Sequence, residues 1–478
     1  MNLCIVNDVM PHDLPAPVSR RQMLRQCGAG FGQLALLGLM SSLGKATAAS
    51  KVNPLAARPA MFPARAKRVI FLFMHGGPSH VDTFDYKPAL IRDSGKPLPF
   101  EKPRIQFAKT SNLRKSPWEF RPYGQSGAMI SDLFPLVGAC ADDLCFLKSI
   151  HGTNEAHGGA LLKLHTGSDT FVRPSMGSWI SYGLGTENQN LPGFITINPT
   201  LGHGGVGNWA SAFLPAVHQG TPIGGGIPVE KATINYLHDP NSDAARQRAQ
   251  LDLLGEMNRQ HLAQAGSDPA LEARIESYEL AFRMQTEAPE TMDVARESEA
   301  TKKLYGLDDP KTASFARQCL LARRFSERGV RFVQVTHPSW DSHEGLTKEH
   351  GKLASEADRP IAGLLRDLKA RGLLKDTLVI WGGEFGRTPT RQGTDGRDHH
   401  PHAFTMWLAG GGVKAGFSYG VTDDYGFYCV DQKVHVHDLH ATILALLGMD
   451  HEQLTYRHAG RDFRLTDVSG RVVKEIFA

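Results

Sequence analysis

The sequence contains the apolar run Arg68-Val69-Ile70-Phe71-Leu72-Phe73-Met74, followed by His75-Gly76-Gly77-Pro78. A short apolar run that ends in a glycine-containing loop is typical of a buried parallel strand that leads into a functional loop. Similar runs recur at 144–150, 193–197, 330–336, 377–381 and 404–409. Amphipathic helical patterns lie between several of them, at 251–262, 269–285, 313–328 and 352–371. Strands that alternate with helices predict an α/β fold with a mainly parallel sheet sandwiched between helices.

The composition fits one large globular domain. The chain has 478 residues, of which 41% are apolar and 21% charged, so a sizeable core is available. The formal net charge is +4, and it falls to +2 without residues 1–48, which carry four basic and two acidic side chains. A net charge so near zero, with no basic stripe, gives no reason to expect a nucleic acid as partner.

The N-terminus reads as a secretory signal. Ser19-Arg20-Arg21 precedes a modest, glycine-containing apolar run at 28–43, and the small residues Ala46-Thr47-Ala48 follow. This pattern indicates a twin-arginine signal peptide at 1–48. A membrane anchor is the alternative, but the run is short for a span of about 20 residues. The sequence therefore predicts a folded, exported protein in the periplasm or cell envelope.

Two segments follow this signal. Residues 49–66 are rich in Ala, Pro and Arg and read as a linker, and residues 67–478 read as the domain. Within it, 203–310 is richer in Gly, Pro and polar residues and is predicted to form an insertion or cap. Cys140 and Cys145 are close enough in sequence to form a disulfide in an oxidising compartment, and buried free thiols are the alternative.

Five polar clusters follow predicted strands, at 74–85, 151–157, 336–344, 381–388 and 396–402. Because the carboxyl ends of parallel strands meet at one edge of a sheet, we expect these clusters to converge. Histidine together with carboxylate suits Zn, Mn, Fe or Ni better than Ca or Mg. Each cluster alone has a structural explanation as a turn or a solvated loop; their recurrence is what predicts a metal site. No Walker A loop or H-E-x-x-H motif occurs.

Four phrases of these clusters resemble a bacterial family that carries twin-arginine signals and is labelled as a domain of unknown function. They are His75-Gly76-Gly77-Pro78-Ser79, Trp340-Asp341-Ser342-His343, Glu384-Phe385-Gly386-Arg387-Thr388-Pro389 and Gly396-Arg397-Asp398-His399. The resemblance runs from about residue 60 to the C-terminus. That family is grouped with the alkaline phosphatase and sulfatase superfamily, which implies an alkaline-phosphatase-like fold.

The resemblance to sulfatases also shows departures. His75 stands where sulfatases have paired aspartates after the first strand. Counting back ten residues from Gly167 places His157 at the position of the nucleophile, where sulfatases have cysteine or serine. Glu384-Phe385 replaces a pair of metal-binding residues, and the segment 436–443 resembles a structural helix near the end of sulfatases. Ordinary sulfatase chemistry is therefore not expected.

The expected site combines these positions. The candidate metal ligands are His75, Asp82, His157, Asp341, His343, Glu384 and His399, enough for one or two divalent ions, Zn or Mn. The candidate catalytic residues are His157, as nucleophile or ligand, with Asn154 and Arg387 contacting the oxygens of the substrate. Asp398 is expected to orient a histidine tautomer.

Two functions follow as expectations. The first is a metal-dependent hydrolase of phosphate or sulfate esters, with a small-molecule or polysaccharide substrate. The alternative is a non-catalytic binding or assembly protein on the same fold, with other exported proteins as partners. A purely structural metal is the third interpretation.

Overall fold

The computed structural model describes residues 54–101, 111–227, 232, 234, 243–265 and 269–478. The predicted signal peptide at 1–48 lies outside these residues. The described part of the predicted linker packs against the domain, since Leu55 is fully buried and the backbone N–H groups of Met61 and Phe62 donate to the carbonyl of Gly448.

A nine-stranded sheet with the order β12-β4-β11-β8-β1-β7-β5-β6, and β15 beside β4, forms the centre of the domain. Its strands are β1 (Arg68–Met74), β4 (Leu144–His151), β5 (Phe194–Ile197), β6 (Thr221–Ile223), β7 (Phe332–His337), β8 (Thr377–Gly382), β11 (Phe404–Ala409), β12 (Phe417–Tyr419) and β15 (Val434–His435). Only β11 runs antiparallel to its neighbours, β4 and β8, and the other described pairings of the sheet are parallel.

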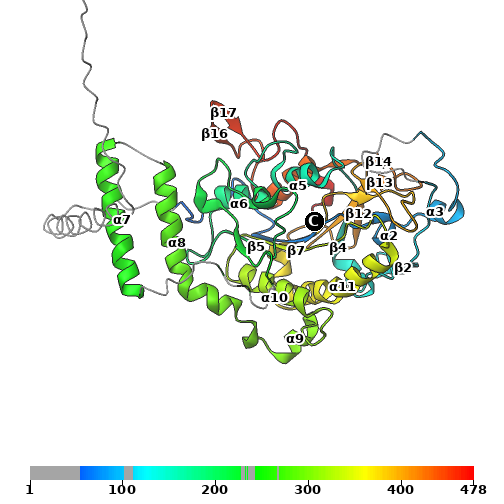
Figure 1. Cartoon of the computed structure of the whole chain (residues 1–478), viewed down its shortest axis with the longest axis horizontal. Helices are drawn as coiled ribbons and strands as arrows, with labels where there is room; N and C mark the ends of the chain where they lie inside the picture. Colours follow the sequence, from blue (N-terminus) through cyan, green and yellow to red (C-terminus); the bar gives the residue numbers. More distant parts are fainter. Residues whose placement is uncertain (1–53, 102–110, 228–231, 233, 235–242, 266–268) are drawn as a thin grey trace, which may run out of the picture. The chain divides into compact units, whose positions relative to one another are not determined.

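Helices cover both faces of the sheet, with α5 and α6 on one side and α10 and α11 on the other (Figure 1). The α-helices are α2 (His80–Thr83), α3 (Pro88–Arg92), α4 (Pro135–Gly138), α5 (His157–Thr166), α6 (Met176–Leu184), α7 (Ala244–Ala265), α8 (Pro269–Met292), α9 (Glu299–Tyr305), α10 (Ala313–Glu327), α11 (Leu346–Ala370) and α12 (Val436–Leu446). Short 3-10 segments are η1 (Ala141–Asp143), η2 (Gly205–Trp209), η3 (Ala216–His218), η4 (Val294–Arg296), η5 (Leu374–Asp376) and η6 (Lys474–Ile476). The predicted sandwich of helices around a mainly parallel sheet is confirmed.

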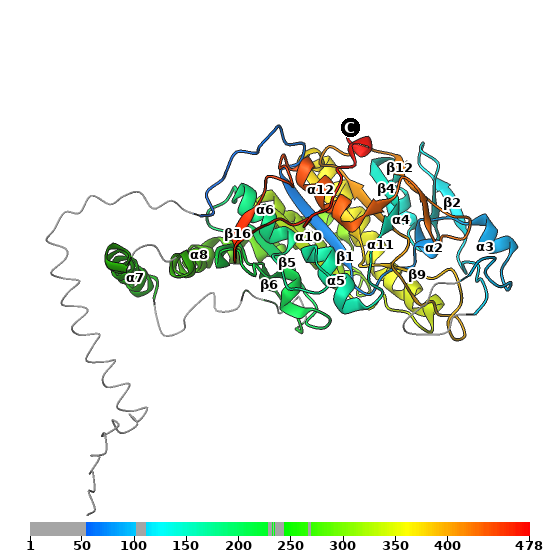
Figure 2. The same ribbon diagram turned by 90° about the horizontal axis from the view of Figure 1, so that it is seen from above.

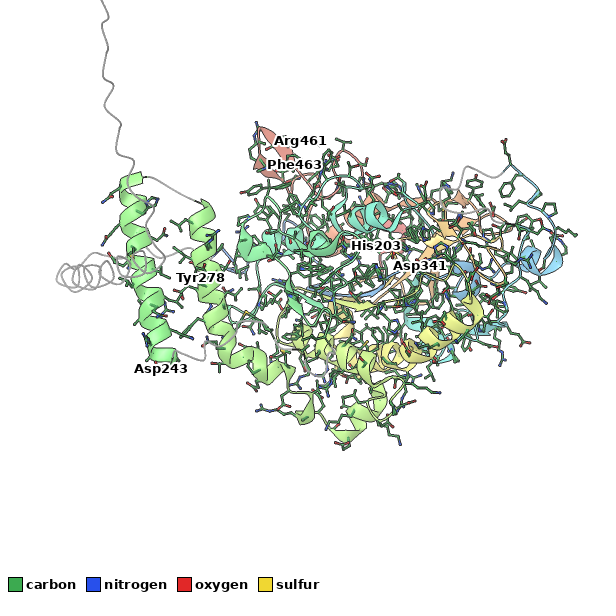
Figure 3. The ribbon with its side chains drawn as sticks, viewed as in Figure 1. His203, Asp243, Tyr278, Asp341, Arg461 and Phe463 are labelled. Carbon is green, nitrogen blue, oxygen red and sulfur yellow. The ribbon has the colours of Figure 1, made fainter. Side chains whose placement is uncertain are left out.

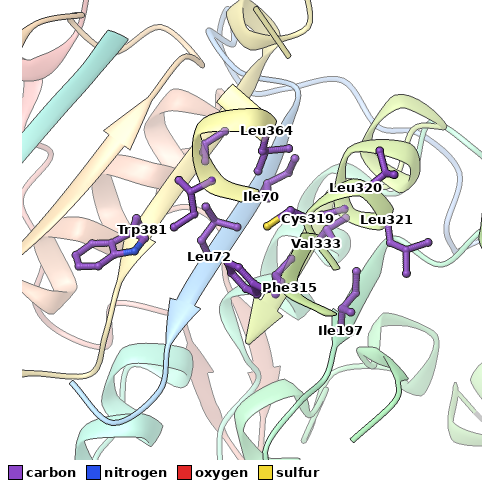
Figure 4. Close-up of a cluster of buried hydrophobic side chains, with 14 of the residues drawn as sticks. Ile70, Leu72, Ile197, Phe315, Cys319, Leu320, Leu321, Val333, Leu364 and Trp381 are labelled. Atoms are coloured by element: carbon purple, nitrogen blue, oxygen red, sulfur yellow. The ribbon is translucent and has the colours of Figure 1, made fainter. Parts of the chain in front are cut away.

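Strand β1 contributes side chains to the cores on both faces of the sheet. Successive side chains of a strand point to opposite faces. Ile70 and Leu72 enter the core beneath α10 and α11 (Figure 4), whereas Phe71 and Phe73 enter the core that contains α6 and α12. A strand that fills two cores has to be apolar at nearly every position, which is the pattern that the sequence shows.

Residues 203–310, predicted to form an insertion or cap, contribute the edge strand β6 and the helices α7 and α8. These two helices lie side by side in both views (Figure 2), and Arg248 of α7 pairs with Glu279 of α8 at 2.7 Å. The role of this segment as a cap stays a prediction.

The remaining strands form small hairpins outside the main sheet. They pair β2 (Phe120–Tyr123) with β3 (Ala128–Ser131), β9 (Gly386–Arg387) with β10 (His399–His400), β13 (Val421–Thr422) with β14 (Cys429–Asp431), and β16 (Tyr456–His458) with β17 (Arg461–Phe463). Of these, the β9–β10 hairpin carries His399 to the carboxyl end of the main sheet.

The four cysteines within the described residues are free and buried, Cys140 and Cys145 included. Among the described residues, no helix combines the length and the apolar character needed to cross a bilayer.

Candidate metal centre

Asp341 is the residue around which the site is built. It lies in the loop after β7, and three histidines from three different segments face its carboxylate. His343 Nε2 lies 3.0 Å and His399 Nε2 3.2 Å from Asp341 Oδ1, and His157 Nε2 lies 3.1 Å from Asp341 Oδ2. The Nε2 atoms of His343 and His399 are themselves only 2.9 Å apart. Figure 3 labels Asp341 at this end of the sheet.

The other ring nitrogen of each histidine faces an oxygen atom. His157 Nδ1 lies 2.8 Å from Glu384 Oε1, His343 Nδ1 lies 2.7 Å from Gln392 Oε1, and His399 Nδ1 lies 2.7 Å from the carbonyl oxygen of Glu155. A carbonyl or carboxylate oxygen only accepts, so each Nδ1 carries a proton and donates it. In its neutral form each ring therefore directs the lone pair of Nε2 towards Asp341.

Lone pairs and a carboxylate that face each other at these distances repel unless a proton or a cation lies between them. Nitrogen donors oriented through their Nδ1 hydrogen bonds, together with one carboxylate, form the arrangement that proteins use to hold a divalent metal. The ligand atoms of His157, Asp341 and His399 all lie within 4.8 Å of one another, as do those of His343, Asp398 and His399. The residues present therefore fit a metal ion.

The close approach of these groups shifts the pKa values of Asp341 and His157. Burial would raise the pKa of Asp341, but His157, His343, His399 and Arg387 hold it well below its usual value. Burial opposes the charged form of His157, whereas Asp341 and Glu384 favour it and raise its pKa to about 9. In the absence of a metal, a proton on His157 would compensate the two carboxylates.

Glu384, a predicted ligand, lies behind His157 and orients its ring. The Glu384 carboxylate is buried and accepts the N–H of Gly76 through both oxygens, at 3.0 and 3.1 Å. Gly76 has φ +112°, and a Cβ there would lie 2.5 Å from the backbone nitrogen of Asp341. Glycine is therefore required where β1 ends, because the loop that carries Asp341 passes directly against it.

Arg387, predicted to bind substrate oxygens, holds Asp341 in place. Its side chain is fully buried. Nη2 donates to Asp341 Oδ1 at 2.6 Å and also to the carbonyl of Gly76, and Nε donates to the carbonyl of Gly77 at 2.9 Å. These N–H groups are used within the protein, which assigns Arg387 a positioning role in this arrangement.

Asp82, another predicted ligand, does not reach the group around Asp341. Its buried carboxylate pairs with the buried guanidinium of Arg397 at 2.6 Å, and it accepts the hydroxyl of Ser79 at 2.6 Å. Residue 82 is on α2, and its side chain faces Arg397. Although residues 75 and 82 are close in sequence, the Asp82 carboxylate does not join the group around Asp341.

His75 lies beside the group without touching Asp341. Its ring centroid is 6.1 Å from that of His157, and its buried Nε2 has no hydrogen-bond partner among the described residues. Burial lowers the pKa of His75. Asn154, a predicted substrate contact, accepts the N–H of Ala156 through Oδ1 at 2.9 Å, immediately before α5.

Two residues of the site were not predicted as functional. His203 stacks on His157 with a ring separation of 4.9 Å and an interplanar angle of 1°, and it adopts φ +46°. Its position between Gly202 and Gly204 is the signal in the sequence, because such flanks permit an unusual backbone. Gln392 orients His343. Phe385, which cannot bind metal, packs its ring on His399 at 4.5 Å.

The centre is open to solvent on one side. The side chain of Asp341 is 37% exposed and that of His343 32%, whereas His157 and Glu384 are buried. A metal here would thus be held by a rigid base and remain accessible to a small molecule.

An α/β domain with a histidine–carboxylate centre at the carboxyl ends of its parallel strands is the class that fold and site define. The chain matches, over residues 66–477, the family described as "Protein of unknown function (DUF1501)". It belongs to this family, which confirms the predicted family membership. A search of curated protein sequences found no match.

Several solved structures are similar to the chain. Ps i-CgsB in complex with k-i-k-neocarrahexaose is 11% identical, with 80% of this chain and 72% of that chain covered and a TM-score of 0.37. The lipoteichoic acid synthase LtaP from Listeria monocytogenes is 11% identical, with 86% and 78% covered and a TM-score of 0.37. Alkaline phosphatase from the Antarctic bacterium TAB5 is 8% identical, with 81% and 99% covered and a TM-score of 0.33. Sheet topology, rather than these low scores, establishes the α/β fold.

Proposed function

We propose that this protein is an exported, metal-dependent hydrolase of phosphate or sulfate esters, with one Zn or Mn ion bound by Asp341, His157, His343 and His399. The observation that carries the proposal is the orientation of three histidines whose Nδ1 atoms face oxygens and whose Nε2 atoms face one carboxylate. A turn is stable without three histidines oriented towards one carboxylate. The solvent-exposed side of Asp341 gives a substrate access to the site.

The surrounding residues have separate roles in this proposal. Glu384 fixes the tautomer of His157, and Arg387 fixes the carboxylate of Asp341. Asn154 remains a candidate for contacting the oxygens of the substrate through its amide group. A divalent cation supplies a Lewis acid and brings the pKa of water towards neutrality, so that hydroxide is available as the attacking group. His157 is better suited as a ligand than as a nucleophile, because both of its ring nitrogens face carboxylates.

Export is proposed from the sequence alone. The paired arginines, the modest apolar run and the small residues that follow support passage through the twin-arginine pathway to the periplasm or cell envelope. A protein that folds before export can bind its metal beforehand. The substrate would then be a small-molecule or polysaccharide ester met outside the cytoplasm.

The test begins with the metal content of the purified protein, measured by inductively coupled plasma mass spectrometry after exposure to Zn or Mn. We expect about one ion per chain in the parent protein and in Asp424→Asn, an exposed control, and little in Asp341→Asn. Hydrolysis of p-nitrophenyl phosphate and p-nitrophenyl sulfate should follow the metal content. Absence of bound metal under all loading conditions would contradict the proposal.

The alternative, a non-catalytic binding protein, is favoured by one feature. The residue at the sulfatase nucleophile position is His157, and it is engaged on both sides. This alternative predicts no turnover of any ester and a stable complex with another exported protein.

A further inference from the structure

A cavity of about 430 Å³ lies between the α2–α3 region and the segment that leads into β2. Its volume falls in the range of small-molecule sites. Neither the candidate metal centre nor its orienting residues line it. Its walls include three aromatic side chains, Tyr86, Trp118 and Phe120, and two lysines, Lys87 and Lys115.

The aromatic side chains supply an apolar wall that is only partly covered. Tyr86, Trp118 and Phe120 are each half-buried, and the rings of Tyr86 and Phe120 lie 5.2 Å apart. Trp118 also packs against the core beneath α10 and α11, which holds it in place. Such rings offer a large contact area at a small entropic cost. The C–H faces of a sugar ring match a surface of this kind.

The same walls carry polar groups that are available to a ligand. The Tyr86 hydroxyl, the Trp118 indole N–H and the Lys115 ammonium make no hydrogen bond to any other side chain or backbone group in the described part of the chain. All three are donors, or can donate, and therefore suit the hydroxyl and anionic oxygens of a ligand.

Of the two lysines at the cavity, only Lys115 lacks an acidic partner among the described residues. Lys87 Nζ lies 3.3 Å from Asp85 Oδ1, which compensates its charge. Glu119 lies 3.7 Å from Arg121, a guanidinium that it shares with Asp132 at 3.3 Å. Lys115 is exposed and has no ion-pair partner among the described residues, so its ammonium is available to an anionic group of a ligand.

We propose that this cavity binds one sugar unit of an anionic polysaccharide, with Trp118 and its aromatic neighbours against the ring and Lys115 on a sulfate group. The site goes beyond the proposed hydrolysis, because none of its residues belongs to the metal centre. The two are nevertheless joined within the fold, since Arg397 pairs with Asp82 of α2 and donates to the carbonyl of Arg114, next to Lys115.

The experiment is isothermal titration calorimetry of the full chain with three probes: a chondroitin 4-sulfate disaccharide, its unsulfated counterpart and inorganic sulfate. We expect the sulfated disaccharide to bind most tightly. Trp118→Ala should weaken its binding at least about tenfold, and Trp118→Phe should restore most of it. Lys115→Met should reduce the preference for the sulfated form by about two- to fivefold, as an exposed charge contributes modestly.

Matched controls separate this site from general effects. Phe171→Ala removes an exposed aromatic ring elsewhere, and Lys348→Met removes an exposed charge on α11; both should bind like the parent. Thermal melting monitored by circular dichroism verifies that each variant is folded.

The outcomes are distinct. Binding that Trp118→Ala and Lys115→Met leave unchanged, or no binding of either disaccharide, would overturn the proposal. Inorganic sulfate binding as tightly as the disaccharide would reduce the cavity to an anion site and also overturn it. Repeating the titration after removal of metal with a chelator distinguishes the two proposals: binding should persist there even if hydrolysis is never found.

Discussion

At the scale of single residues, Glu384 shows how a buried carboxylate acts through another side chain. Both of its oxygens accept the Gly76 N–H, and one also accepts from His157 Nδ1. The carboxylate thereby fixes which nitrogen of His157 carries the proton. Groups that orient a metal-binding histidine in this way typically change metal affinity by about 10- to 100-fold when they are lost.

Glu384→Gln is therefore expected to weaken Zn binding by about 10- to 100-fold with the fold intact. The amide can present an N–H to His157 Nδ1, which would move the proton of the imidazole to the nitrogen that should face the metal. Competition with a chromogenic chelator measures the affinity. Glu344→Gln, an exposed neighbour in sequence of His343, is the control. Equal affinity in Glu384→Gln and the parent would remove Glu384 from this role.

A second residue-scale prediction concerns Asp358 of α11. Its buried carboxylate accepts the N–H groups of Leu136 and Val137, at 2.9 and 2.8 Å, and so caps α4. Burial nevertheless dominates and raises its pKa from 3.8 to about 6. The folded state thus holds a proton that the unfolded chain has released between these pH values.

Because the folded state holds this proton more tightly, protonation of Asp358 favours folding. The contribution of Asp358 to stability is complete below about pH 4 and is lost as the pH rises through about 6, by up to about 3 kcal/mol at 1.36 kcal/mol per pKa unit. Urea unfolding at pH 4.5 and pH 7 should show about 2 kcal/mol of this difference in the parent. Asp358→Asn should remove it, whereas the exposed Asp424→Asn should not. An identical pH dependence in parent and Asp358→Asn would contradict the assignment.

At the scale of elements, the Arg397–Asp82 pair joins α2 to the segment that ends in His399. Both side chains are fully buried, and Arg397 also donates to the carbonyls of Thr388 and Arg114 at 3.1 and 3.0 Å. Removing one partner of a buried pair leaves the other charge unpaired in a poorly solvating environment. The pair therefore links α2 to the segment that leads to His399.

Arg397→Met is expected to destabilise the protein by about 3–5 kcal/mol, because the Asp82 carboxylate stays buried without its partner. The double variant Arg397→Met/Asp82→Asn should recover a large part of the loss. Arg457→Met, which removes an exposed pair with Asp462, should change stability by less than about 1 kcal/mol. Urea denaturation measures all three, and equal effects of the two arginine substitutions would refute the argument.

The elements also show what the sequence predicts well. The central strands were predicted to within two residues because an apolar run buried on both faces has few alternatives. The helix α5 was missed, since Gly158 and Gly159 in its first turn weaken the helical pattern. The antiparallel β11 follows from the β9–β10 hairpin: residues 383–403 contain no helix that could return the chain for a parallel strand.

At the site, the sequence predicted the converging segments but not every contact. Each of the five polar clusters does bring a histidine or carboxylate to the centre or its immediate surroundings. Which of these side chains contact one another depends on a few tertiary contacts. Such contacts join residues far apart in the chain, so the local sequence pattern does not predict them. Asp82 is drawn to Arg397, 315 positions away, and His203 comes from a glycine-rich loop that has no strand-end pattern.

At the scale of the whole molecule, the candidate ligands come from segments far apart in the chain. His157 begins α5, Asp341 and His343 follow β7, and His399 lies on β10. In the unfolded chain these side chains are not assembled. A metal that binds only the folded state stabilises it by RT ln(1 + [L]/Kd), about 2.7 kcal/mol when the free metal is at 100 times its Kd.

The melting temperature should therefore rise with the concentration of Zn or Mn, by a few degrees at saturation, and the rise should continue logarithmically above the Kd. Because bound metal competes with protons on the same histidines, the shift should be larger at pH 8 than at pH 5.5. Differential scanning calorimetry measures it. Asp341→Asn should melt at the same temperature with and without metal, whereas Asp424→Asn should behave like the parent. A shift of equal size in Asp341→Asn would place the metal elsewhere on the chain and leave the convergence of the three histidines without a ligand to explain it.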